Sequence, residues 1–116
     1  MTAKGQNFEM WQGDDKVLRV TVVDDADVPV DISGSTIKWV IYKRTGENVV
    51  LSKTLASGIA LTVPASGIFE ITLDRADTLN LLGNSFNHEA ELSDASNNRS
   101  TIFTGTVAIH RSLANV

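Results

Sequence analysis

Short runs in which apolar and polar residues alternate, separated by turn-forming residues, constrain the fold of this chain more than any other feature. Because alternate residues of a strand point to opposite faces of a sheet, such a run is typical of a strand with one buried side. The clearest run is Lys16–Val23. There Leu18 and Val20 share one face, and Arg19 lies on the other. Helical periodicity is nearly absent, so the pattern predicts an all-β fold.

The same alternation recurs along the chain and predicts eight short strands, with an edge segment at Val28–Val30. The strands are Asn7–Gln12, Lys16–Val23, Thr36–Lys43, Val49–Thr54, Gly58–Val63, Phe69–Leu73, Phe86–Ser93 and Ser100–His110. Seven or eight short antiparallel strands at this spacing favour an immunoglobulin-like β-sandwich over a closed barrel. The spacing alone does not give the strand order.

At most one short helix is expected, near Asp74–Leu82. Asp74 suits its N-cap, and Gly83 suits its C-terminal cap. Ala76 and Leu79 would share its buried face with Leu82. A tight hairpin is expected at Thr45–Asn48.

The length of 116 residues fits a single domain. We divide it into an N-terminal arm or first strand, residues 1–12, and one sandwich domain, residues 13–116. Trp39 is the predicted centre of the core. Trp11 is also expected in the core, with an exposed contact residue as the alternative, because tryptophan is enriched in both places. Gly105 marks a bulge or a close neighbour in the last strand.

Composition and charge exclude several classes of function. Ten Lys and Arg residues are scattered among 14 Asp and Glu residues, which disfavours nucleic-acid binding. No cysteine is present, so disulfide frameworks and thiolate metal sites are excluded. Residues 1–10 lack the apolar centre of a signal peptide, and no stretch approaches the roughly 20 apolar residues that cross a bilayer. We therefore expect a protein that is soluble when made and has no membrane partner.

The side chains that usually carry catalysis are few. The two histidines are His88 and His110, and no nucleophile elbow or phosphate-binding loop accompanies them. His88 falls on the apolar face of its strand, where a hydrogen-bonded structural role is expected. Glu89 and Glu91 share a strand face without a proton donor opposite them, so we interpret them as exposed charges. We predict no enzyme activity, no catalytic residue, no cofactor and no small-molecule substrate.

Four carboxylates lie close together in the sequence. They are Asp24, Asp25, Asp27 and Asp31, and together they could supply oxygen ligands to calcium. Their spacing does not match an EF-hand, so a solvated turn is the expected structure and no metal site is predicted.

Several motifs follow one another in a recognisable order. Gln12-Gly13-Asp14-Asp15 opens a strand, Val28-Pro29-Val30-Asp31-Ile32-Ser33-Gly34 leads into Thr36-Ile37-Lys38-Trp39, and Gly67-Ile68-Phe69-Glu70-Ile71 precedes the strand Phe86–Leu92 and a closing Gly105-Thr106-Val107. This order resembles small phage virion proteins, including the N-terminal domains of baseplate upper proteins. The resemblance implies an immunoglobulin-like module that attaches to the virion. Larger members continue into a fibre or receptor-binding region, and we expect this host-binding extension to be absent here.

A structural virion protein of the tail, baseplate, neck or capsid surface is therefore the leading hypothesis. Its partners would be other virion proteins and copies of itself, and it would be made in the host cytoplasm. Phe8, Met10, Trp11 and Tyr42 are the candidate contact residues. A carbohydrate-binding or adhesin-like sandwich is the alternative, with Trp11 and Tyr42 as its aromatic platform.

Overall fold

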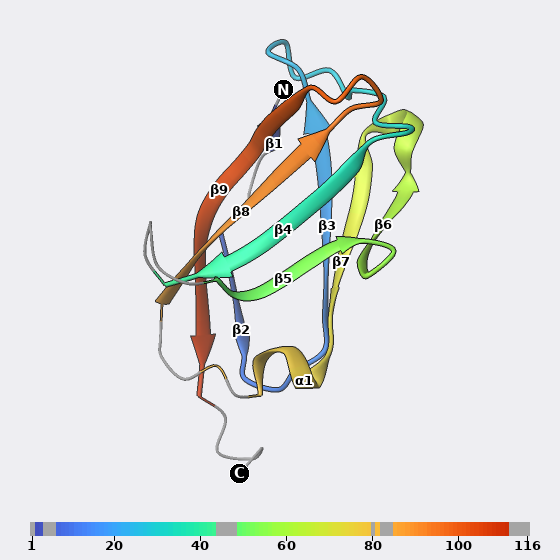
Figure 1. The fold of residues 1–116 in the computed structure, drawn as a ribbon. Coiled ribbons are helices and arrows are strands. Elements are labelled where there is room, and N and C mark those ends of the chain that lie inside the picture. Colours follow the sequence, from blue (N-terminus) through green and yellow to red (C-terminus); the bar gives the residue numbers. More distant parts are fainter. Residues whose placement is uncertain (1, 4–6, 44–48, 80, 82–84, 112–116) are drawn as a thin grey trace.

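The computed structural model describes residues 2–3, 7–43, 49–79, 81 and 85–111. This part of the chain contains nine strands, one 3-10 turn and one short helix (Figure 1). The elements in chain order are β1 (Thr2–Ala3), β2 (Phe8–Trp11), β3 (Lys16–Val23), β4 (Thr36–Tyr42), β5 (Val49–Leu55), β6 (Gly58–Val63), η1 (Pro64–Ser66), β7 (Ile68–Leu73), α1 (Arg75–Thr78), β8 (Ser85–Ser93) and β9 (Arg99–His110). The predicted all-β class is confirmed, and each predicted strand is present within one or two residues of its expected bounds.

The strands are hydrogen-bonded in the order β1-β3-β7-β6-β5-β4-β8-β9-β2. The continuous sheet folds over where β5 meets β6, so that its two halves face each other across the core (Figure 1). One half, β1-β3-β7-β6, matches the ABED sheet of immunoglobulin domains, and β4-β8-β9 in the other half matches CFG. The fold is thus an immunoglobulin-like sandwich. Two contacts, β2 with β9 and β5 with β6, are parallel.

The N-terminal segment takes part in both halves of the sandwich. Its first two described residues pair with Val22 and Val23 of β3, whereas β2 pairs with the end of β9. Met10 of β2 is buried in the core. The described part of residues 1–12 is therefore built into the sheet and is not a free arm.

Trp39 lies at the centre of the core with no exposed surface, as predicted. Its indole N–H donates to Nδ1 of His88 on β8, at 2.9 Å. Immunoglobulin domains place a tryptophan on the equivalent strand, against a disulfide. This chain has no cysteine, and the buried His88 packs edge-on to Trp39 instead. The predicted structural role of His88 is confirmed.

The one short helix expected near residues 74–82 is present as the single turn α1, with Asp74 as its N-cap. Oγ1 of the buried Thr78 accepts the Gly13 N–H, and the Leu81 N–H donates to the Thr78 carbonyl. Ala76 is exposed and forms no buried face. Leu82, Gly83 and the hairpin turn at 45–48 lie outside the described residues.

The irregularity of β9 lies earlier than Gly105. Ala90 of β8 pairs with Phe103, but the next residue, Glu91, pairs with Thr101, so one extra residue enters β9. As a result both Ile102 and Phe103 are buried. This bulge lets two consecutive apolar side chains reach the core. Gly105 itself pairs regularly with His88.

Candidate functional site

The motif at residues 12–15 joins the β2–β3 turn to the helix. The Gln12 amide donates to the Leu79 carbonyl at 2.7 Å, and the Gly13 N–H donates to Oγ1 of Thr78 at 2.9 Å. The Asp15 carboxylate accepts the N–H of Arg75 at 2.9 Å, at the first residue of the helix. These bonds satisfy backbone groups at one end of the sandwich, so the motif has a structural role.

The second and third motifs meet at the opposite end of the sandwich. Pro29 forms an isolated β-bridge with Val23. The hydrogen bonds of this bridge are made by the flanking residues, so the missing N–H of proline costs no hydrogen bond there. Gly67 has φ +74°, and a Cβ on it would lie 2.6 Å from the Val22 carbonyl and 2.7 Å from the Val30 carbonyl. Only glycine fits between these two segments. The motifs that carry the family resemblance therefore form the joints of the fold.

Trp11 is exposed over 56% of its surface, so its expected place in the core is wrong. The alternation within β2 explains this, because Phe8 and Met10 face inward and Glu9 and Trp11 face outward. The Trp11 ring lies 5.0 Å from the ring of His110 on β9. Nε2 of His110 in turn lies 3.1 Å from a carboxylate oxygen of Glu9. We call Glu9, Trp11 and His110 the Trp11 patch.

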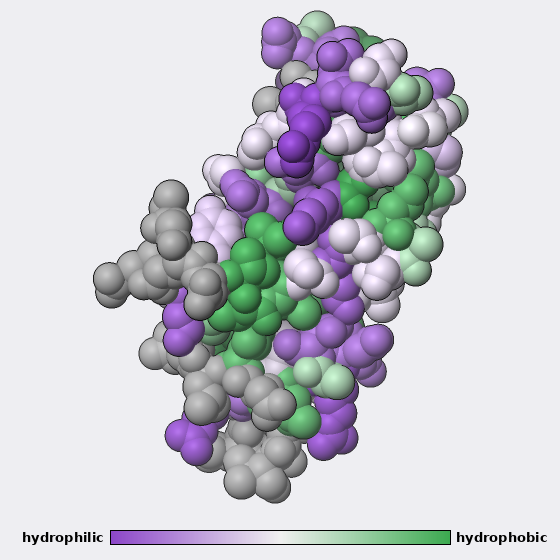
Figure 2. Space-filling view, in the orientation of Figure 1, coloured by the Kyte–Doolittle hydropathy of each residue, from purple (hydrophilic) through white to green (hydrophobic). Residues whose placement is uncertain are grey.

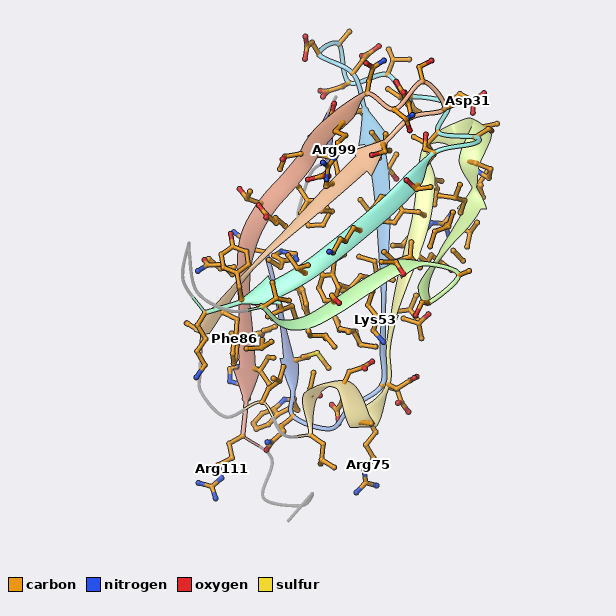
Figure 3. The ribbon with its side chains drawn as sticks, in the orientation of Figure 1. Asp31, Lys53, Arg75, Phe86, Arg99 and Arg111 are labelled. Carbon is orange, nitrogen blue, oxygen red and sulfur yellow. The ribbon has the colours of Figure 1, made fainter. Side chains whose placement is uncertain are left out.

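The surroundings of the Trp11 patch are open and include one cation. A shallow hollow of about 310 Å³ adjoins it, lined by residues 7–9 of the N-terminal segment, Ser85, and residues 106–108 of β9. Arg111 follows His110 directly, and its exposed side chain projects from the same end of the domain as Arg75 (Figure 3). Tryptophan and arginine are the residue types that most often anchor protein–protein contacts.

The other predicted contact residues do not join the Trp11 patch. Met10 belongs to the core, and Phe8 is half-buried with its ring 5.2 Å from that of His88. Tyr42 is half-buried on the same outer sheet face as Trp11, but it lies on β4, and β8 and β9 separate it from β2. Figure 2 shows apolar side chains gathered near the middle of the face toward the viewer, with hydrophilic side chains around them.

The acidic residues of the loops serve as turn formers. One carboxylate oxygen of Asp24 accepts the N–H groups of Ala26 and Val28, at 2.8 and 3.0 Å. Hydrogen bonds from the Ser33 side chain and backbone hold the pKa of Asp31 below its usual range. Within the described ranges, no three His, Asp or Glu side chains gather to hold a metal ion. No helix among these residues is long and apolar enough to cross a membrane.

Comparisons with known proteins bear on the fold. No protein-family profile matches the sequence, and no curated protein is significantly similar to it. The SrpA adhesin of Streptococcus sanguinis superposes with a TM-score of 0.52 at 14% identity, over 94% of this chain and 57% of the adhesin chain. CopC from Methylosinus trichosporium OB3b gives 0.47 at 15% identity, over 96% and 91%. The chain thus spans little more than half of the adhesin, with which it shares a sandwich fold.

Proposed function

We propose that this protein is a structural component of a bacteriophage virion, in the tail, baseplate, neck or capsid surface. It acts as a protein–protein assembly module and not as an enzyme. The order of its motifs, which resembles small phage virion proteins, supports the virion assignment. Its partners are other virion proteins and copies of itself, with no nucleic acid or membrane involved.

The observation that carries the assembly role is the exposed Trp11 on a strand that is paired within the sheet. Its strand is hydrogen-bonded to β9, and the Gln12 and Gly13 joints hold the residues that follow. The backbone that carries the indole therefore needs little further ordering to bind a partner, which lowers the entropic cost of association. Covering the exposed half of a tryptophan contributes about 2–4 kcal/mol. A contact of this size, repeated around a symmetric particle, is sufficient for a docking anchor.

A single substitution tests this role. Trp11→Ser removes the anchor from the outer face, and Val28→Ser is the matched control because Val28 is 53% exposed in a loop at the other end of the domain. The measurement is quantitative mass spectrometry of virions purified from cells that supply each variant. We expect Trp11→Ser to lower incorporation at least tenfold and Val28→Ser to leave it unchanged. Equal incorporation of the two variants would refute the proposed anchor.

Deleting residues 1–12 is a poor test of docking. The deletion removes Met10 and Phe8 from the core and Gln12 from the joint with the helix. The expected result is therefore loss of folding, which would abolish assembly for an unrelated reason. The point substitution separates the two effects because Trp11 contributes little to the core.

The second candidate function is carbohydrate binding. One observation favours it: the exposed Trp11 ring stands near the Glu9 carboxylate, which pairs an apolar platform with a hydrogen-bond acceptor. Size-exclusion chromatography with light scattering and a glycan array discriminate the two. An oligomer that binds no glycan supports assembly. A monomer whose glycan binding is lost in Trp11→Ser supports the alternative.

A further inference from the structure

Strands β2 and β3 follow one another through a tight turn and run in opposite directions, yet they do not pair (Figure 1). β2 pairs with β9, and β3 pairs with β7 over residues 16–21. A slot of about 180 Å³ opens between them, which we call the β2–β3 seam. Its walls are Phe8 and residues 16–20 of β3, and its floor is His88 and Phe103. The floor residues are buried, and Val17 on the wall is 55% exposed.

Some backbone N–H and C=O groups of β3 face the seam. The Val22 N–H bonds to the Gly67 carbonyl beside β7. Because backbone groups alternate sides along a strand, those of Leu18 and Val20 point toward β7, and those of Val17 and Arg19 point into the seam. Among the described residues, β3 pairs on this side only at Val22 and Val23. Within the described ranges, Val17 and Arg19 therefore lie on a strand edge that has no β partner.

The charge of the seam is opposite to that of the whole chain. The chain carries a net charge of -4, but the charged residues that line the seam are Lys16 and Arg19. Glu70 is the cross-strand neighbour of Arg19 on β7, and no ion pair joins them among the described residues. Glu9, on the outer face of β2, is paired with His110. The rim is thus cationic around a floor of two rings, the His88 imidazole and the Phe103 phenyl ring.

We propose that the β2–β3 seam binds an extended acidic–apolar segment of a partner protein by strand addition to β3. The free edge from Lys16 to Val20 accommodates about five residues at about 3.4 Å per residue. Alternate apolar side chains of the segment enter the seam over Phe8 and Phe103, and its carboxylates lie beside Lys16 and Arg19. Backbone bonds to Val17 and Arg19 supply the pairing. This second surface is distinct from the Trp11 patch, and its occupancy does not depend on the virion assignment.

The probe is an acetylated, amidated heptapeptide of alternating glutamate and valine, with a matched peptide in which lysine replaces glutamate. Binding to the full chain is measured by amide hydrogen exchange in NMR spectra. We expect the acidic peptide to slow exchange at Val17 and Arg19. Leu18 and Val20 should stay unchanged because their amides already bond to β7. Absence of saturable binding, or protection at other amides, would overturn the proposal.

Charge reversal at the seam provides an independent test. Lys16→Glu with Arg19→Glu should weaken binding of the acidic peptide about tenfold at low salt, because two like charges then flank the seam. Lys38→Glu with Lys43→Glu on β4 and just beyond it makes the same change in net charge and should leave binding intact. Equal affinity of the two double variants contradicts the proposal. The lysine peptide repeats this test without altering the protein, and tight binding of it would also contradict the proposal.

Discussion

The chain has two tryptophans and two histidines, and it pairs them in two contrasting places. Trp39 and His88 lie in the core, with ring centroids 5.9 Å apart and an indole hydrogen bond of 2.9 Å. Trp11 and His110 lie on the outer face, 5.0 Å apart, and Trp11 is 56% exposed. The buried pair must satisfy each polar atom internally, whereas water can serve the exposed one. The contrast is consistent with a stabilising role for the buried pair and with the recognition role that we propose for the exposed one.

The largest expected difference comes from truncating each tryptophan. Trp39→Ala should lower the free energy of unfolding by about 3–5 kcal/mol, because it empties the centre of the core. Trp11→Ala should change it by about 0.5 kcal/mol or less, since the ring is mostly in water. Guanidinium denaturation of both variants measures the two values. Similar losses in the two variants would break the proposed division of roles.

Substitution of the buried histidine should also lower the free energy of unfolding more than substitution of the exposed one. The difference should be smaller than that between the tryptophan variants. His88→Leu leaves the buried Trp39 indole N–H without its acceptor, at a cost of about 1–3 kcal/mol. His110→Leu should stay within about 0.5 kcal/mol. Urea denaturation provides the measurement, with His88→Gln as a rescue variant because its amide oxygen can accept the indole N–H. If Leu and Gln at position 88 behave alike, shape and not the hydrogen bond accounts for the loss.

A third substitution tests whether the position of Trp11 beside His110 depends on the hydrogen bond between Gly13 and Thr78. Thr78→Val keeps the side-chain shape but removes the oxygen that accepts the Gly13 N–H. We expect a loss of about 1–2 kcal/mol in unfolding free energy. Hydrogen exchange should also become faster at Gly13 and in β2. Unchanged exchange there would show that Trp11 is positioned by β9 alone.

The smallest expected effect is on stability at low pH, and it arises from carboxylates in the loops. Hydrogen bonds from the Asn98 backbone, with smaller contributions from the Asn98 side chain and the Ser96 backbone, hold the pKa of Asp94 below its usual range. The pKa of Asp31 is lowered in the same way by Ser33. A lowered folded-state pKa stabilises the fold above the unfolded value, and this contribution is lost as pH falls through the folded value. Thermal unfolding of Asp94→Asn should therefore depend less on pH below about 4 than that of the wild type.

Much of the fold could be predicted because alternation is a local property. Lys16–Val23 and Gly58–Val63 have the predicted bounds, and Trp39 lies where the alternation of β4 puts it. The strand order could not be predicted. β3 pairs with β7 and β4 with β8 across long stretches of chain, and many edges have similar alternating faces. The contact between Thr78 of the helix and Gly13 could not be predicted either, because it joins residues 65 positions apart in the chain.

The candidate site shows a different kind of limit. The alternation that put Phe8 and Met10 on one face already put Trp11 beside Glu9 on the other, so its exposure could have been read from the sequence. The contact with His110 could not, because it requires the parallel pairing of β2 with β9. The bulge at Ile102 and Phe103 was likewise hidden, since two adjacent apolar residues do not show which of them is inserted.

The most direct test of the division between the two pairs is hydroxyl-radical footprinting of the indoles in the free protein and in the assembled particle. Mass spectrometry resolves the peptides that contain Trp11 and Trp39, so each sample has an internal reference. We expect Trp11 to be oxidised readily in the free protein and protected in the particle, with Trp39 protected in both. Equal oxidation of Trp11 in the two states would contradict the account.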